Sequence, residues 1–260
     1  MSALCDAVVA ITRQSGAIIQ QQWTLPRHVT HKGRIDLVTE TDVAVENYLK
    51  ENLKDLVPGV QFLAEESADG QTRPHDDCWI IDPVDGTTNF VHGIPLVGTS
   101  VGLWRDGRME LGVVNMPIMQ ECFYAQRGAG AWSATGQRLS VSPVHTLHEA
   151  VVATGFPYDI PCWQGRILEW LGAVLPSAQG VRRMGAASVD LAYVAAGRFE
   201  AFYEADLKPW DVAAGWLLVE EAGGLVSGVD GVPYQWGEVI VASNGHVHQA
   251  LRELLVSGHK

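Results

Sequence analysis

Cysteine and long apolar runs are both scarce in this chain, and each shortage excludes a class of protein. The four cysteines among 260 residues lie far apart and form no Cys-x-x-Cys pair, so neither a disulfide framework nor a zinc site of that kind is expected. No apolar stretch approaches the ~18–20 residues that a membrane-spanning helix requires, and the N-terminus lacks the basic and apolar regions of a secretory signal. We therefore expect a cytoplasmic protein with reduced thiols.

Basic residues are also few. Thirty Asp and Glu stand against 18 Lys and Arg, which gives a formal net charge of -12. The basic residues gather in no group larger than a pair such as Arg182-Arg183, so the surface is not expected to bind nucleic acid or an anionic membrane. The acid excess raises a different question, which is whether some of these carboxylates form a metal site.

Repeats, low-complexity segments and linkers are absent from the sequence as well. Apolar residues make up 47% of the chain and charged residues 18%, which excludes a disordered, collagen-like or coiled-coil protein. A chain of this length buries enough surface to fold without a disulfide or metal. Since no boundary stands out, we expect residues 1–260 to form a single domain.

Hydrophobic periodicity predicts a mixture of helices and strands. A helix is predicted over 3–22, and a second helix is predicted from a cap at Thr41 to Pro58-Gly59. Further helices are predicted at 162–175, 187–196, 211–222 and 246–256. Strands are predicted at 60–64, 78–81, 121–126, 139–142, 150–154, 199–204 and 238–242, with a hairpin of 97–103 and 109–114. The pattern favours an antiparallel sheet packed between helices.

The segment Asp82-Pro83-Val84-Asp85-Gly86-Thr87-Thr88 places two acids at the end of an apolar strand. Pro83 removes a backbone donor and fixes the turn, and Gly86 permits a sharp turn or a close approach to a ligand. Thr87 and Thr88 then open a short helix, whose free amides suit an anion. Cation ligands and a phosphate site would thus lie side by side, although the same residues could form a simple polar turn in which Asp85 caps a helix.

Three further acidic segments are ambiguous when each is taken alone. They are Glu65-Glu66-Ser67 after a strand, Asp211 near a helix start, and the run from Asp36 to Asp42. Each acid could be a surface residue or could offset a helix dipole. The small residues after Asp211 would let that helix end pack close to another backbone. Taken together, the segments supply the carboxylates of a multi-metal phosphotransfer site, for which Mg²⁺ is the suitable cation.

These segments resemble the signatures of the inositol monophosphatase family of magnesium-dependent, lithium-sensitive sugar phosphatases. The run 82–87 is similar to the family's first signature and 210–215 to its second, while 36–42 and 65–67 match accompanying segments. Two more segments are similar to bacterial members, namely 155–158 and 182–188. The resemblance covers nearly the whole chain in order. It implies the α+β class, with a layered α-β-α-β-α sandwich of the inositol monophosphatase and fructose-1,6-bisphosphatase type, usually as a homodimer.

The resemblance implies a set of metal ligands. Glu65, Asp82 and the carbonyl of Val84 match the ligands of a first Mg²⁺. Asp82, Asp85 and Asp211 match those of a second Mg²⁺. A third and weaker Mg²⁺ would depend on Glu65 through waters, so two to three ions are expected in each active site.

The resemblance also implies roles in catalysis. The amides of Gly86 and Thr87 match the family's phosphate-binding cradle. The hydroxyl of Thr87 and the carboxylate of Asp42 resemble the pair that orients the attacking water, and Glu65 shares in catalysis through its metal. The implied mechanism is in-line attack by a metal-activated water, without a phospho-enzyme, and it needs no Cys, Ser or His nucleophile.

Substrate contacts are implied for Asp85, Ala187 and Glu204, which align with positions that touch substrate hydroxyls in inositol phosphatases. Glu204 could also be an ordinary acid on a surface strand. Lys32 is similar to a basic residue near the family's mobile metal loop, but its spacing from Asp36 differs from the family pattern.

The implied activity is hydrolysis of myo-inositol monophosphate, or of a similar polyol or sugar phosphate, to the free polyol and inorganic phosphate. The run Thr88-Asn89-Phe90 resembles inositol-type members, whereas relatives that act on 3'-phosphoadenosine 5'-phosphate show Lys-Glu-Phe there. Histidinol-phosphatase, fructose-1,6-bisphosphatase and 3'-phosphoadenosine 5'-phosphate phosphatase activities remain alternatives, because fold analogy does not decide a substrate.

Two readings from other classes explain fewer residues. A phosphatase with an Asp-x-Asp nucleophile does not fit the Asp-x-x-Asp spacing of Asp82 and Asp85, and it leaves the segment around Asp211 unexplained. A non-catalytic interaction protein that kept the fold would be expected to lack a ligand, and none of the matched ligands is missing. A small phosphorylated polyol is therefore the expected partner.

Overall fold

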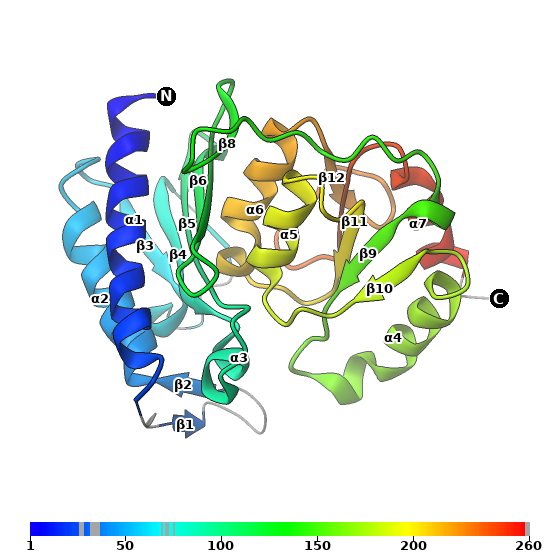
Figure 1. The fold of residues 1–260 in the computed structure, drawn as a ribbon, viewed down its shortest axis with the longest axis horizontal. Coiled ribbons are helices and arrows are strands. Elements are labelled where there is room, and N and C mark those ends of the chain that lie inside the picture. Colours follow the sequence, from blue (N-terminus) through cyan, green and yellow to red (C-terminus); the bar gives the residue numbers. More distant parts are fainter. Residues whose placement is uncertain (26–28, 32–36, 69, 71–72, 75, 258–260) are drawn as a thin grey trace.

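The computed structural model describes residues 1–25, 29–31, 37–68, 70, 73–74 and 76–257. The layers run helix, sheet, helix, sheet, helix across the molecule (Figure 1), which confirms the expected α+β layered sandwich. The helices are α1 (Ala3–Gln22), α2 (Glu40–Leu53), α3 (Thr87–His92), α4 (Ile160–Val174), α5 (Ala187–Ala195), α6 (Pro209–Glu221) and α7 (His248–Ser257). No helix in this part of the chain is long and apolar enough to cross a membrane.

The first sheet contains the acidic signature. Its strand order is β3-β4-β5-β6-β7-β8. The strands are β3 (Gln61–Ala64), β4 (Cys78–Asp85), β5 (Gly98–Arg105), β6 (Arg108–Met116), β7 (Glu121–Gln126) and β8 (Gly130–Ser133). Only β3 and β4 pair in parallel. The predicted hairpin is confirmed as β5–β6, and Asp106 and Gly107 both have positive φ in its turn, as a tight two-residue hairpin requires.

The second sheet has the order β10-β9-β11-β13-β12. Its strands are β9 (Val151–Thr154), β10 (Gly180–Arg182), β11 (Ala201–Glu204), β12 (Leu225–Gly228) and β13 (Ile240–Ser243). β9 lies parallel to both of its neighbours, whereas β13 runs antiparallel to both of its own. Short strands β1 (Val29–His31) and β2 (Leu37–Thr39) form a separate ribbon before α2.

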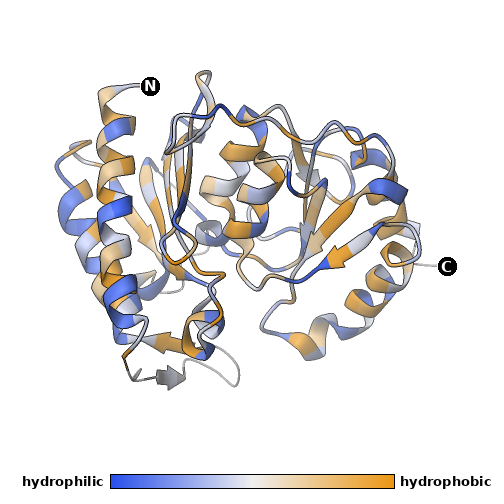
Figure 2. Cartoon of the chain, viewed as in Figure 1, coloured by the Kyte–Doolittle hydropathy of each residue, from blue (hydrophilic) through white to orange (hydrophobic). Residues whose placement is uncertain are grey.

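Buried apolar side chains form a core on each face of the sheets. One core joins α1 and α2 to the first sheet through residues such as Val8, Leu49 and Trp79. A second core lies between the two sheets, around α5 and α6. The third packs α4 and α7 on the outer face of the second sheet. Figure 2 shows the matching pattern, because the strands are largely hydrophobic while α1 and α2 carry both hydrophobic and hydrophilic residues.

Three local predictions were wrong. Segment 139–142 is not a strand, because after one bond from Leu139 N to Ala131 O the chain turns to the end of α6, where Val141 N bonds Ala222 O. The N-cap of α2 is Thr39 rather than Thr41, since Thr39 is extended and its hydroxyl accepts from the Thr41 amide. Helix α2 ends at Leu53, before the predicted Pro58-Gly59 stop.

Helix α6 lies unusually close to the first sheet, as its run of small residues predicts. Gly102 on β5 pairs with Gly112 on β6, and both face α6. A Cβ added at Gly112 would lie 2.8 Å from the carbonyl oxygen of Ala214. The middle of α6 is therefore held against the sheet by direct backbone contact.

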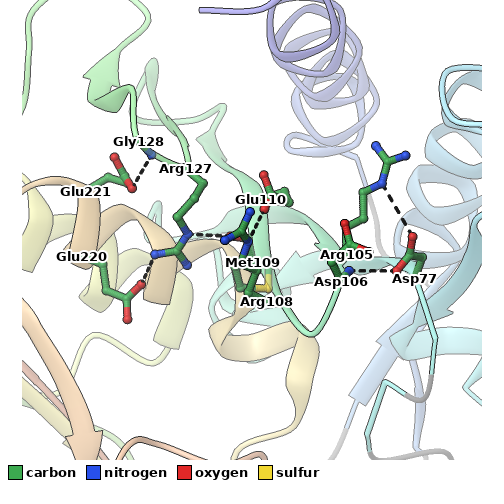
Figure 3. Close-up of polar contacts among 10 residues, drawn as sticks. All are labelled: Asp77, Arg105, Asp106, Arg108, Met109, Glu110, Arg127, Gly128, Glu220 and Glu221. Carbon is green, nitrogen blue, oxygen red and sulfur yellow. Dashed lines mark hydrogen bonds and ion pairs between the residues drawn. The ribbon is translucent and has the colours of Figure 1, made fainter.

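The far end of α6 is held by ionic and backbone hydrogen bonds (Figure 3). Arg127 Nη1 lies 2.6 Å from Glu220 Oε2, while Arg127 Nε donates to the carbonyl of Met109 at 2.9 Å. The amide of Gly128 donates to Glu221 at 2.8 Å. The middle and the C-terminal end of α6 are thus positioned by the first sheet, which fixes where Asp211 lies.

Candidate active site

A bulge in β4 places both acids of the central signature in one site. Residues three apart in a regular strand point to opposite faces, but the β4–β5 register shifts between Asp82 and Asp85. Pro83 occupies the bulge, where its missing donor costs no ladder bond, and its carbonyl accepts from Thr99 Oγ1 at 3.0 Å. The bulge therefore changes the direction in which a side chain points at the end of β4.

Gly86 connects this strand to α3 through a left-handed backbone, with φ 88° and ψ 40°. A Cβ here would also lie 2.9 Å from the carbonyl of Leu96, so glycine is needed for both conformation and space. Helix α3 then begins at Thr87, as predicted. Its first amides lie beside the two aspartates.

Asp42 and Thr87 meet across 45 residues of sequence. Thr87 Oγ1 lies 3.0 Å from Asp42 Oδ1 and 3.0 Å from the Val84 carbonyl. The other oxygen of Asp42 accepts from Thr39 N at 2.9 Å and from Thr39 Oγ1 at 2.5 Å. The structure thus brings together the predicted pair and fixes Asp42 through the start of α2.

Helix starts also orient Asp211 and Asp85. Asp211 Oδ2 accepts from the amide of Lys208 at 2.7 Å, in the first turn of α6. Asp85 Oδ2 accepts from both the amide and the hydroxyl of Ser188, at 2.7 and 2.5 Å, in the first turn of α5. Ser188 was not predicted as a site residue, because only the fold brings the start of α5 to the end of β4.

Glu65 begins a short 3₁₀ turn, η1 (Glu65–Ser67), directly after β3. Since β3 and β4 are parallel and adjacent, their carboxyl ends meet at one edge of the sheet. This places Glu65 beside Asp82, whose pKa the charge of Glu65 raises. The four ligand carboxylates predicted from separate segments are therefore neighbours.

A cavity of about 440 Å³ opens over these acids. Its floor includes Glu65, Asp85 and Asp211, while Asp82 lies beneath them and is only 2% exposed. The cavity lining also includes Gly86, Thr87, Gly155, Phe156, Arg183, Ala187, Asp190 and Glu204. Phosphate-binding, metal-binding and substrate-binding candidates thus share one cavity.

Electrostatics at the cavity floor favour a bound cation. Burial and the neighbouring carboxylates raise the pKa values of Asp82 and Asp211 well above the usual range of Asp. Burial also raises the pKa of Asp85, against the opposing effect of its hydrogen bonds from Ser188. Buried acids that repel one another need protons or cations to offset their charge.

The chemistry of the donors suits a hard cation. The candidate ligands are carboxylate oxygens and the carbonyl of Val84, and oxygen is the ligand atom that Mg²⁺ prefers. Among the described residues, no three His, Cys, Asp or Glu side chains form a group that could hold a metal ion on their own. Mg²⁺ in proteins usually keeps several waters and shares its ligands with substrate phosphates.

The cavity lining also includes the predicted substrate residues and two that were not predicted. Ala187 and Glu204 both line it. Beside them lie Asp190, whose Oδ1 is buried without a hydrogen-bond partner, and Arg183, whose guanidinium lies 5.5 Å from the centre of the Phe156 ring. Burial, opposed by the charge of Arg183, raises the pKa of Glu204 to about 8.

The sequence offered a partial signal for these residues. Arg183 and Asp190 lie in or next to the segment that resembles bacterial members, but no spacing rule connects them with Glu204. Lys32 and Asp36 lie outside the described residues.

Comparison with known proteins assigns the family. Residues 1–259 match the sequence model of the inositol monophosphatase family. The chain belongs to the inositol monophosphatase family. It is 40% identical over 260 residues to inositol-1-monophosphatase of Caulobacter vibrioides, with 98% of each chain covered. It is 37% identical over 254 residues to Nus factor SuhB of Escherichia coli, covering 96% of this chain and 95% of that protein.

A solved structure agrees with this assignment. The extragenic suppressor protein suhB of Bartonella henselae superposes with a TM-score of 0.90 at 35% identity, and the match covers 98% of both chains. The chain is therefore an enzyme of the inositol monophosphatase family, a phosphoric monoester hydrolase.

Proposed function

We propose that this enzyme is a Mg²⁺-dependent phosphomonoesterase that hydrolyses myo-inositol monophosphate or a similar polyol phosphate. One observation carries the proposal. The buried carboxylates of Asp82 and Asp85 and the half-buried carboxylate of Asp211 meet Glu65 beside the first amides of α3. Cation ligands and anion donors are thereby adjacent, as phosphoryl transfer requires.

The chain offers ligands for two to three ions. Glu65, Asp82 and the carbonyl of Val84 would hold one Mg²⁺, and Asp82, Asp85 and Asp211 a second, while a third would depend on Glu65 through waters. Bound Mg²⁺ would supply positive charge that acidifies a water, neutralises the phosphoryl oxygens and stabilises the leaving alkoxide. The hydrogen bonds from Ser188 and Lys208 hold Asp85 and Asp211 in place for this role.

Thr87 and Asp42 orient the attacking water. The single hydroxyl proton of Thr87 points to either Asp42 or the Val84 carbonyl, both of which lie 3.0 Å away. The Thr87 oxygen keeps lone pairs that can accept a proton of a water molecule. Burial raises the pKa of Asp42 against its hydrogen bonds from Thr39 and Thr87, which makes this carboxylate a better proton acceptor than an exposed one.

The remaining contacts hold the substrate. The amides of Gly86 and Thr87, at the start of α3, would bind the phosphate. Asp85, Ala187 and Glu204 would contact the hydroxyl groups of the polyol. Asn89 in the inositol-type run does not line this cavity, and its Nδ2 donates to the carbonyls of Leu96 and Met184, both at 2.8 Å. It therefore supports the loops around the cavity.

Phosphate release tests the proposal. We expect Mg²⁺-dependent turnover of inositol-1-phosphate that exceeds turnover of histidinol phosphate, fructose-1,6-bisphosphate and 3'-phosphoadenosine 5'-phosphate. Asp82→Asn should abolish turnover while the protein stays folded, because the substitution removes a charge shared by two metals. Asp77→Asn is the matched control, since Asp77 is an exposed acid just before the same strand. Millimolar lithium should inhibit the wild-type enzyme.

Several results would contradict the proposal. Turnover of none of the four esters with Mg²⁺ would exclude it, and near-normal activity of Asp82→Asn would exclude the metal assignment. Preference for another ester would move the function to that alternative on the same fold. A cytoplasmic homodimer forms part of the proposal, because family members usually assemble in this way.

A further inference from the structure

Helix α2 carries two buried acids one helical turn apart. Asp42 is fully buried and Glu46 is 4% exposed. The first acid contacts Thr87, in the proposed water-orienting pair. Glu46 lies on the same side of the helix, because residues four apart are neighbours on a helix surface. Nothing in the proposed chemistry uses Glu46, and a buried carboxylate is costly unless its hydrogen bonds are satisfied.

Glu46 clamps the turn that carries Glu65. Its Oε2 accepts from the amide of Glu66 at 2.8 Å, and its Oε1 accepts from the hydroxyl of Ser67 at 2.6 Å. Lys50 Nζ donates to the same Oε1 at 2.9 Å. Two of these donors belong to η1, so a single side chain of α2 holds both residues that follow Glu65.

Turn η1 has no side-chain cap of its own. Its N-cap position is Ala64, whose side chain has no acceptor for the amides of the turn. Glu46, which lies on α2, provides the acceptor instead. Hydrogen bonds to a charged acceptor are about twice as strong as neutral ones. The orientation of η1 relative to β4 therefore depends on α2.

We propose that Glu46 is a positioning residue that sets the carboxylate of Glu65 for metal binding. The proposal rests on the proposed function to the extent that it treats Glu65 as a metal ligand. Because Asp42 and Glu46 share one helix, α2 holds the water-orienting pair and the Glu65 turn in one rigid arrangement. Residues that orient metal ligands through hydrogen bonds usually change metal affinity by about 10- to 100-fold when they are replaced.

Metal affinity in the full-length protein tests the proposal without depending on turnover. We expect Glu46→Ala to weaken binding of Mn²⁺, an oxygen-preferring substitute for Mg²⁺, by about 10- to 100-fold when followed by electron paramagnetic resonance. The Mg²⁺ concentration for half-maximal activity should rise similarly, while kcat at saturating Mg²⁺ changes less. Glu46→Gln should restore most of the affinity, because its amide can accept from Glu66 and donate to Ser67.

Glu51→Gln is the matched control. Glu51 lies on the same helix, but its side chain is 72% exposed and pairs with Lys54, so Mn²⁺ affinity should not change. Folded Glu46→Ala protein that binds Mn²⁺ as tightly as the wild type would overturn the proposal. If Glu46→Ala does not fold, Ser67→Ala decides, since it removes only one contact of the clamp: weaker Mn²⁺ binding supports the proposal and unchanged binding overturns it.

The two proposals fail separately. An inactive wild-type protein that hydrolyses no phosphate ester would contradict the proposed function. The Mn²⁺ titrations would still decide whether Glu46 positions Glu65.

Discussion

At the residue scale, the absence of a side chain at Gly155 leaves room for the carboxylate of Glu204 in the cavity. A Cβ added at Gly155 would lie 2.0 Å from Glu204 Oε2 and 2.3 Å from its Cδ. Glu204 is itself only 7% exposed and has little room to move. The space that glycine leaves at 155 is therefore the space in which the Glu204 carboxylate lies.

Gly155→Ala should displace Glu204 and weaken substrate binding. Leaving a buried polar group without its partner costs about 1–3 kcal/mol, so we expect KM for inositol-1-phosphate to rise by roughly fivefold or more. The Mg²⁺ requirement should stay unchanged, because Glu204 is not one of the proposed metal ligands. Steady-state kinetics at several Mg²⁺ concentrations measure both effects.

Gly172→Ala is the matched control for this prediction. Gly172 lies in α4, and an added Cβ would meet nothing within 4 Å. The same substitution there should leave KM unchanged and stabilise the helix by about 0.5–1 kcal/mol. A wild-type KM for Gly155→Ala would mean that Glu204 does not contact the substrate.

Residues of the site differ in how far the sequence could predict them. Asp82 and Asp85 are marked by a local pattern, since a strand, a proline and a glycine surround them within six positions. Glu46 and Ser188 are not marked, because their partners Glu66 and Asp85 lie 20 and 103 residues away. Such pairs exist only once the layers have packed, so periodicity and spacing cannot reveal them.

At the element scale, the position of α6 depends on two paired glycines of the first sheet. Gly102 and Gly112 lie opposite each other on β5 and β6. An added Cβ at Gly112 meets backbone atoms of Ala214, at 2.8 and 2.9 Å, whereas at Gly102 the nearest atom is the flexible end of Met109. The two positions differ in what must move, although both face the same helix.

Gly112→Ala should therefore be more damaging than Gly102→Ala. Overpacking usually costs about 1–3 kcal/mol, and we expect the upper part of this range at Gly112, because α6 itself must shift. That shift would move Asp211 and weaken Mg²⁺ binding as well as stability. Gly102→Ala should cost less, since Met109 can change rotamer. Urea unfolding measures the difference, and equal losses would show that the backbone contact with α6 does not matter.

Elements with strong local signals were predicted, and those formed by distant pairing were not. Helices α1 and α4 have caps of their own, in which Ser2 and Asp159 accept from amides three residues on. The strands that were missed in the two large sheets, β8, β10 and β12, are all short and all lie at a sheet edge. Whether a short segment becomes an edge strand depends on whether a neighbouring strand pairs with it. Segment 139–142 was predicted as a strand, but it does not pair as one.

At the scale of the whole molecule, the acid excess is explained in part by the cavity. Asp82, Asp85 and Asp211 are gathered from two layers, and the helix pair α5 and α6 lies between both sheets. Composition alone disfavoured a nucleic-acid surface, which stays an expectation, and it could not show that carboxylates converge. That convergence depends on sheet order and on the β4 bulge. The single domain over residues 1–260 stays a prediction.

Stability of the whole molecule should depend on the protonation of a buried histidine far from the cavity. His248 begins α7, and its ring nitrogens lie 2.8 Å from Ser227 Oγ and 2.9 Å from Ser243 Oγ. The Ser227 hydroxyl donates to Gly228, so it accepts from Nε2, which leaves Nδ1 to accept from Ser243. This arrangement requires a neutral ring, and burial lowers the pKa of His248 to about 4.

The sign of the pH effect follows from linkage. Because the folded pKa lies below the unfolded value of 6.5, the unfolded state binds the proton first as the pH falls. The contribution of His248 to the free energy of unfolding is complete above pH 6.5 and is lost progressively towards pH 4, by at most ~3 kcal/mol. His248→Gln should therefore be less stable than the wild type at pH 7, with a difference that shrinks as the pH approaches 4.

Denaturant unfolding of the wild type and of His248→Gln between pH 4 and 8 measures this difference in the free energy of unfolding. The titration of all other groups is common to both proteins and cancels in the difference. His246→Gln, an exposed position two residues away, is the control and should follow the wild type at every pH.

If the two sheets unfold as one unit through their shared middle layer, the effect of His248 should be equal when followed by probes in either sheet. A constant difference between wild type and His248→Gln across the range would show that the ring is not held neutral, and probe-dependent midpoints would show that the sheets unfold separately.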